Sequence, residues 1–183
     1  MGSNSDGFNY SSVVMDGVSG QNVKIDFEHY EVHEGDSYHS VNSQNVNTAT
    51  FKWQVTTPNT DKFAHMIFGV QATGEVTVLI TEGSDRTDGT AMGEMNRDRN
   101  STNTAGVIVT YTPTAGATDG ATTILTTRIG ATGVGSKTLS PGAARGTAEW
   151  ILKKNTKYVI SATTYADIWV TFIADWYEHT DTA

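Results

Sequence analysis

The middle of the chain consists of short runs rich in Thr, Val and Ile, separated by nearly uncharged stretches of Gly, Thr, Ala and Asn. This pattern extends from about Phe51 to Glu178, and no stretch of helix length within it has the apolar spacing of an amphipathic helix. β-Branched and aromatic residues suit a pleated, half-buried surface, while Gly, Asn and Asp supply turns. The sequence therefore predicts an all-β fold, a two-sheet antiparallel sandwich that is jelly-roll-like.

Individual strands are predicted where apolar residues alternate or cluster. Alternation is clearest at Phe51, Trp53 and Val55, which we expect to face the core. Lys24–His33 is also expected to be extended, with a β-bulge near Glu28 where the parity of its apolar residues changes. The other predicted strands are 63–70, 75–81, 107–111, 124–129, 150–152, 158–162 and 168–177. The remaining expected core residues are Ile67, Val78 and Val109, and no helix longer than about two turns is expected.

The length of 183 residues fits one domain. Residues 1–23 are polar and are predicted to form an extended N-terminal arm, and residues 24–183 the sandwich. The arm carries four isolated apolar anchors, namely Phe8, Tyr10, Val13 and Val14. Its start has neither a basic nor an apolar region, so no signal peptide is predicted.

Composition narrows the classes of function. The net charge of −8 argues against nucleic-acid binding, which needs clustered Lys and Arg. No apolar run is long enough to predict a membrane span. The absence of Cys excludes disulfides and thiolate chemistry and favours a protein assembled in the cytosol, or one of microbial or viral origin.

Charge is sparse and unevenly placed. Only 17% of residues are charged, where about a quarter is typical, which suggests either surface that is buried against neighbours or a surface suited to harsh conditions. Acidic residues gather within 6–36 and basic residues within 128–157, either as solvated patches or as complementary docking faces. Two long connections, 83–105 and 130–147, are interpreted as binding loops.

Two groups of side chains could hold a metal. His29, Glu31 and His33 alternate, so a regular strand would put all three on one face, where they could bind zinc or iron. The expected bulge would break that geometry, and hydrogen-bonded or interface residues are the favoured interpretation. Three acidic side chains could bind calcium, namely Glu82, Asp85 and Asp88. Their spacing lacks the order of an EF-hand and its final Glu. No metal or other cofactor is predicted.

No catalytic constellation is recognisable. The five His lie in no hydrolase elbow, and no phosphate loop is complete, so the protein is not expected to be an enzyme. Glycoside cleavage by a pair of carboxylates stays an open alternative, because a sequence does not show which carboxylates lie close together in space. The tryptophans could form a sugar-stacking platform, but all lie in predicted strands and core packing is favoured: Trp53, Trp150, Trp169 and Trp176.

Five stretches carry a family resemblance when they are taken together. They are His29–Tyr38, Thr57–His65, Asn96–Asn103, Glu149–Tyr158 and Asp175–His179. As a set they resemble a family of tailed-bacteriophage virion proteins, and the similarity spans most of the chain from about residue 15 onward.

The resemblance implies a structural protein of the phage virion, of the head decoration or cement type. Such proteins are commonly β-rich, often form a homotrimer, and bridge neighbouring capsomers on the outer surface of the capsid. The implied partners are the major capsid protein and further copies of the chain, with no nucleic acid and no membrane. The implied location is the virion, after synthesis in the host cytoplasm.

The arm and the two long loops are the expected contact elements, since several weak contacts together raise avidity. The residues expected at the interface are Phe8, Tyr10, Val13, Val14, Asp85, Arg86, Arg97, Arg99, Lys137 and Arg145. The alternative is a carbohydrate- or receptor-binding module of a phage head or tail fibre. Exposed Trp or Tyr on one sheet face would favour that alternative.

Overall fold

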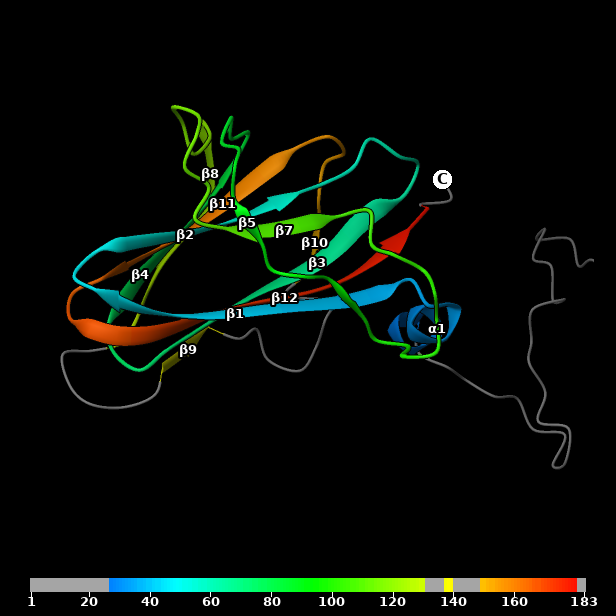
Figure 1. The fold of residues 1–183 in the computed structure, drawn as a ribbon, viewed down its shortest axis with the longest axis horizontal. Helices are drawn as coiled ribbons and strands as arrows, with labels where there is room; N and C mark the ends of the chain where they lie inside the picture. Colours follow the sequence, from blue (N-terminus) through cyan, green and yellow to red (C-terminus); the bar gives the residue numbers. More distant parts are fainter. Residues whose placement is uncertain (1–26, 131–136, 140–148, 181–183) are drawn as a thin grey trace, which may run out of the picture.

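The computed structural model describes residues 27–130, 137–139 and 149–180, and these form a sandwich of two antiparallel sheets with one short helix (Figure 1). The predicted all-β, two-sheet class is confirmed. The N-terminal arm, residues 1–23, lies outside the described residues. No helix in the described part of the chain is long and apolar enough to cross a membrane.

The strands divide between two sheets. Sheet 1 has the order β10-β3-β12-β1-β6, with β9 also paired to β3. Its strands are β1 (Ser37–Asn47), β3 (Phe63–Ala72), β6 (Met95–Asn96), β9 (Lys137–Leu139), β10 (Trp150–Ile151) and β12 (Asp167–His179). Sheet 2 has the order β5-β7-β2-β11-β4-β8. Its strands are β2 (Thr50–Thr56), β4 (Val76–Glu82), β5 (Thr90–Ala91), β7 (Ile108–Tyr111), β8 (Thr122–Ile129) and β11 (Lys157–Thr164).

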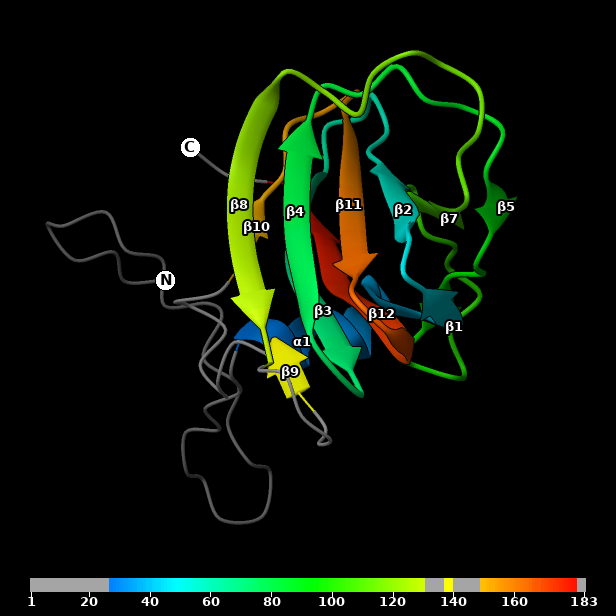
Figure 2. The same cartoon turned by 90° about the vertical axis from the view of Figure 1, so that its left-hand side faces the viewer.

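The pairing of the strands is that of a jelly roll. The first long strand pairs with the last, β1 with β12, and then β2 pairs with β11, β3 with β9 and β10, and β4 with β8. These pairs alternate between sheet 1 and sheet 2, so the chain wraps around the core as a folded ribbon of antiparallel strands. Figure 2 shows β8, β4, β11 and β2 side by side, with β3 and β12 in the layer behind.

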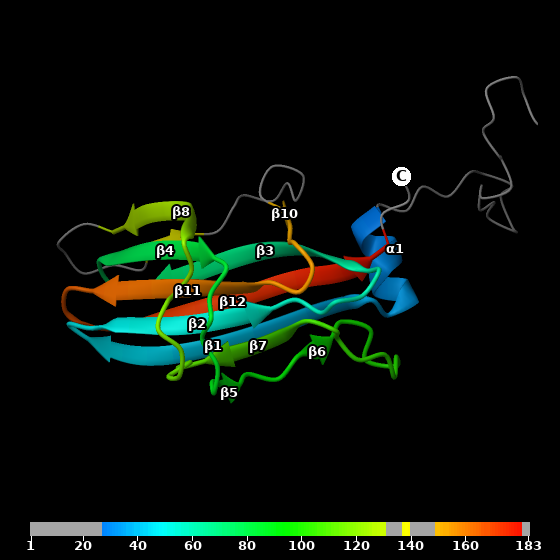
Figure 3. The ribbon, with the colours of Figure 1, turned by 90° about the horizontal axis from the view of Figure 1, so that it is seen from above.

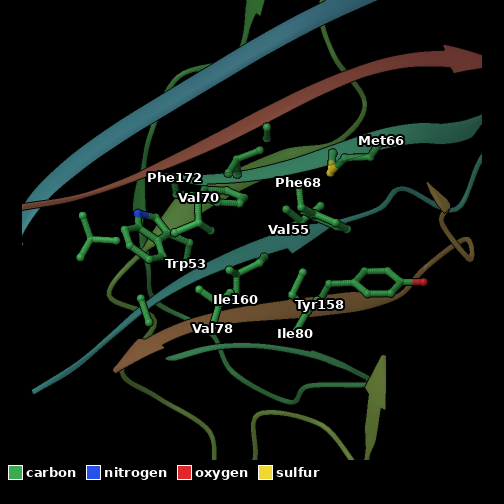
Figure 4. Packing of buried hydrophobic residues seen from close by; sticks show 14 of the residues in the cluster. Trp53, Val55, Met66, Phe68, Val70, Val78, Ile80, Tyr158, Ile160 and Phe172 are labelled. Carbon is green, nitrogen blue, oxygen red and sulfur yellow. The ribbon is translucent and has the colours of Figure 1, made fainter. Parts of the chain in front are cut away.

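The core fills the space between the sheets (Figure 4). Trp53 of sheet 2 packs on Phe172 of sheet 1 with ring centroids 5.5 Å apart, and its Nε1 donates to Asn42 Oδ1 at 2.9 Å. The predicted core residues that are fully buried are Trp53, Val55, Val78 and Val109, and Phe51 packs partly buried against them.

Ile67 was predicted in the core, and this prediction is wrong. The inner face of β3 carries Met66, Phe68 and Val70, all buried, and Ile67 alternates with them on the outer face. Because β3 is apolar on both faces, period-two alternation could not tell the inner residues from the outer ones.

The segment predicted as a bulged strand at Lys24–His33 is instead helix α1 (Phe27–Glu34) over its described residues. The change of apolar parity does not mark a bulge, and the only buried residue of the helix is Glu31. The helix ends in a Schellman motif: Gly35, with φ 76°, donates to Val32 O, and Asp36 N donates to Glu31 O.

Strand β1 was not predicted. Its residues are mostly polar, and its inner face holds only two large apolar side chains, Tyr38 and Val46. It is nevertheless paired with β12 along its whole length. It forms one side of the surface described next.

Candidate interaction surface

Part of the outer face of sheet 2 is covered by the chain's own loops. Loops 83–89 and 112–121 cross over β11 and β2 (Figure 3). Lys52 Nζ, on the outer face of β2, lies 2.5 Å from Asp119 Oδ2, and Arg86 also binds that carboxylate. Beneath the loops, Val159 is fully buried although it points away from the core.

Asp119 is the centre of this cover. Burial alone would raise the pKa of Asp119, but hydrogen bonds and positive charge from Lys52 and Arg86 outweigh it and hold the pKa below its usual value. Asp119 O also accepts a hydrogen bond from Thr81 Oγ1 on β4. These contacts fasten loop 112–121 to β2 and β4 of sheet 2 and to loop 83–89.

The acidic group considered for calcium does not converge. Glu82 binds Lys153 Nζ and Tyr158 OH, whereas Asp85 Oδ1 accepts from Thr118 N at 2.8 Å. That backbone hydrogen bond is the main cause of the lowered pKa of Asp85. No group of three metal-ligating side chains is found among the described residues.

Among the described residues, no loop covers most of the outer face of sheet 1. We define the bare face by outward residues of three neighbouring strands and by Met95 of β6. They are Ile67, Gly69 and Gln71 of β3, Trp169, Thr171, Ile173 and Asp175 of β12, and His39, Val41, Ser43 and Asn45 of β1. In this register Ile173 lies between Gly69 and Val41, and Asp175 lies between Ile67 and His39.

The bare face carries exposed apolar side chains among polar ones. Val41, Met95 and Trp169 have exposed fractions of 49%, 57% and 55%. Antiparallel sheets commonly carry polar residues on the face that is turned to water. Exposed apolar side chains that gather on one face indicate a site of association.

One end of the outer face is covered by helix α1. Phe27 packs edge-on against Tyr177 and His179, with ring centroids 5.7 Å and 4.9 Å apart. On the inward side of the helix, Glu31 is buried, and burial is the main cause of its raised pKa. Glu31 Oε1 lies 3.3 Å from His179 Nδ1. The helix therefore sets the limit of the bare face.

A charged hollow lies at the edge of the bare face next to β6. It has a volume of about 400 Å³ and is lined by His39, Met95, Asn96, Arg97 and Arg99. His39 Nδ1 lies 2.8 Å from Asp175 Oδ1, and Arg97 binds the same oxygen. Burial would raise the pKa of Asp175, but the hydrogen bonds and charges of His39 and Arg97 outweigh it, so the pKa is lowered.

The loop that bears Arg97 and Arg99 is anchored at both ends. At its start, Arg97 N donates to Ser37 O at 2.8 Å, and Asn96 Nδ2 donates to Gly35 O at 2.6 Å. At its end, the buried carboxylate of Glu178 accepts from the backbone N–H groups of Gly106 and Val107. These bonds hold the two arginines beside the hollow.

The structure brings together only some of the residues predicted at an interface. Arg97 and Arg99 line the hollow, while Asp85 and Arg86 belong to the loop cover on sheet 2. Lys137 begins β9. The others lie outside the described residues: Phe8, Tyr10, Val13, Val14 and Arg145.

Sequence reasoning missed His39, Asp175 and the apolar residues of the bare face. His39 and Asp175 are 136 positions apart, so only the pairing of β1 with β12 brings them together. The alternation of His39, Val41 and Ser43 is a usable signal once β1 is recognised as a strand.

The four tryptophans do not form one platform. Trp53 and Trp176 are fully buried, whereas Trp150 and Trp169 are exposed. Trp150 pairs with Met66 on β3, whereas Trp169 N donates to Thr73 Oγ1. Thr73 lies seven residues after Met66 in the chain. At about 3.3 Å per residue, the two exposed rings are separated by about 23 Å along the strand.

The His39–Asp175 pair resembles part of a catalytic triad, in which a carboxylate orients an imidazole. Here Arg97 shares the carboxylate oxygen, and among the described residues no Ser or Thr hydroxyl is hydrogen-bonded to His39. The arrangement suits recognition of an anionic group better than activation of a nucleophile. Comparison with protein-family models, curated proteins and solved structures found no match for this chain.

Proposed function

We propose that the protein is a non-enzymatic structural component of a tailed-bacteriophage virion, of the head-decoration kind, which docks on the capsid shell through the bare face. The observation that carries the proposal is the contrast between the two outer faces. The chain's own loops cross β2 and β11 of sheet 2, whereas sheet 1 leaves Val41, Met95 and Trp169 exposed. The five stretches that resemble phage virion proteins support the choice of partner.

The fold supports this proposal only by analogy. Jelly rolls occur in viral capsid domains and also in lectins, and a fold alone does not determine a function. The physical role follows from linkage, because a protein that binds only the assembled shell stabilises that shell by mass action.

The size of the bare face indicates that attachment is multivalent. Its residues span seven positions of β1, seven of β12 and five of β3, which at about 3.3 Å per residue and about 4.8 Å between strands cover only about 300 Å². A standard interface buries about 800 Å² on each partner. A homo-oligomer, with a trimer favoured, would multiply the contact area and raise avidity.

The test is co-sedimentation of the purified protein with capsids that lack it. Val41→Glu should reduce capsid binding at least tenfold, because it places a charge in the apolar contact. Ile108→Glu is the matched control, since Ile108 is 51% exposed and lies on β7 of sheet 2. Equal binding by both variants would reject the bare face as the docking surface.

One observation favours a second candidate, a carbohydrate- or receptor-binding module. Trp169 is exposed on the bare face, close to the polar side chains of Asn45 and Thr171. A glycan array would distinguish the two functions: glycan binding that is lost in Trp169→Ala, without any capsid binding, would support this candidate.

A further inference from the structure

Helix α1 places two histidines where they can act as a pair. His29 and His33 are four residues apart, so they lie one above the other on the same face of the helix. Both side chains are exposed, and their Nε2 atoms are 3.0 Å apart. The ring planes are nearly perpendicular, at 82°. Glu31, which shares their spacing on a strand, points inward on the helix and is buried.

We propose that His29 and His33 chelate one divalent transition-metal ion through their Nε2 atoms. Imidazole nitrogens bind such ions at about 2.0–2.1 Å. With the nitrogens 3.0 Å apart, that bond length gives an N–metal–N angle of about 91–97°. The spacing of the two nitrogens, which form a hydrogen bond in the metal-free protein, therefore matches the distance between two nitrogens bound to one metal ion, and the metal would replace that hydrogen bond.

The angle selects the kind of metal. It is close to the right angle of square-planar or octahedral coordination and well below the tetrahedral value of about 109° that zinc prefers. Copper(II) and nickel(II) take tetragonal geometry with nitrogen ligands, and copper(II) has the highest affinity in the divalent series. Copper(II) is the expected ion, and among the described residues no third metal-ligating side chain joins the pair.

The helix that carries the pair is held in place by independent contacts. The Schellman motif at Gly35 fixes its C-terminal end, and a Cβ atom on Gly35 would lie 2.3 Å from Ser101 Oγ. Phe27 packs on Tyr177 and His179 at the other end. Because these contacts do not use the imidazoles, the chelating geometry exists before the metal binds, which lowers the entropic cost of binding.

The first experiment is a calorimetric titration of the full-length, tag-free protein with copper(II), together with its electron paramagnetic resonance spectrum. We expect a site of one copper per chain with nitrogen hyperfine structure from two imidazoles. At free copper one hundred times its dissociation constant, the unfolding equilibrium constant should fall about 100-fold. His29→Gln and His33→Gln should each weaken binding at least tenfold.

The decisive control keeps the number of histidines constant. The double variant His33→Gln with Glu34→His moves the second imidazole about 140° away from the first around the helix, so it should lose the site as fully as His29→Gln. His39→Gln, on strand β1, should bind copper as the native protein does. Retention of native affinity in the shifted double variant, or loss of it in His39→Gln, would overturn the proposal.

Discussion

Replacement of Glu178 by Gln tests how the loop that carries Arg97 and Arg99 is held. Glu178 is 6% exposed, and its carboxylate accepts four hydrogen-bond contacts from three N–H groups. Gly106 N lies 2.8 and 3.0 Å from its two oxygens, Val107 N lies 2.9 Å away and Trp176 Nε1 lies 3.1 Å away. The carboxylate therefore joins the loop to the core of sheet 1.

The expected cost follows from the bonds that glutamine cannot make. A glutamine side chain at this position would keep one acceptor oxygen but turn an NH₂ group toward the N–H of Gly106. A hydrogen bond to a charged group contributes about 1.5–3 kcal/mol, and an unsatisfied buried donor costs about 1–3 kcal/mol. We expect Glu178→Gln to lower the free energy of unfolding by about 2–3 kcal/mol, which lowers Tm by about 4–12 °C for a domain of this size.

Urea unfolding followed by tryptophan fluorescence measures this loss, and hydrogen exchange locates it. Exchange should rise in residues 97–107 more than in β3. Asp61→Asn is the matched control, because Asp61 is 99% exposed and its pairing with Lys154 is a surface contact. A loss below about 0.5 kcal/mol in Glu178→Gln would refute the anchoring role.

Gly106 provides an internal check on the same reasoning. A Cβ atom at Gly106 would lie 2.7 Å from Glu178 Oε2, so Gly106→Ala should displace the carboxylate from its donors. The two substitutions remove the same interaction. Their effects on stability should therefore be less than additive in a double-mutant cycle, and strict additivity would mean that the contacts are independent.

Two further substitutions test other parts of the structure. Gly35→Ala should lower the free energy of unfolding by about 1–3 kcal/mol and reduce copper affinity, because residue 35 has a φ of 76° and the added Cβ atom would clash with Ser101. Urea unfolding measures the loss of stability, and an unchanged midpoint would contradict the prediction. The lowered pKa of Asp175 means that its contribution to stability is present above the ordinary Asp value of about 3.9 and is lost as pH falls through the lowered pKa. The stability difference between the native protein and Asp175→Asn, measured from about pH 5 downward, should therefore shrink below about pH 4, and a constant difference down to pH 2 would contradict this.

Much of the sandwich could be predicted because its inner strands alternate or are wholly apolar. Trp53 and Val55 alternate with polar residues, and this period of two places them in the core. Alternation of apolar and polar residues does not reveal strand β1, because Ser40 and Asn42 on its inner side are polar. Asn42 satisfies the indole N–H of Trp53 on the other sheet, a requirement that appears only after the two sheets have been packed together.

Helix α1 could not be recognised for a related reason. A buried Glu31 occupies its inward face, so the segment lacks the apolar stripe that identifies a surface helix. The expectation of a bulged strand also hid the pairing of the two histidines. On a regular strand Glu31 would share a face with His29 and His33, and the expected bulge would have broken that arrangement. Local periodicity fails here because the partner of the buried Glu31 is His179, at the other end of the described chain.

The difference between the two outer faces also gives the proposed docking a direction. Loops 83–89 and 112–121 are tied to sheet 2 by Lys52, Arg86 and Asp119, so they do not need a partner to shield the strands beneath them. Sheet 1 has no such cover over Val41 and Trp169 among the described residues. A partner that binds sheet 1 leaves these loops on the opposite side of the sandwich, turned to solvent. The tips of these loops, and not the bare face, are therefore where an insertion would least disturb attachment.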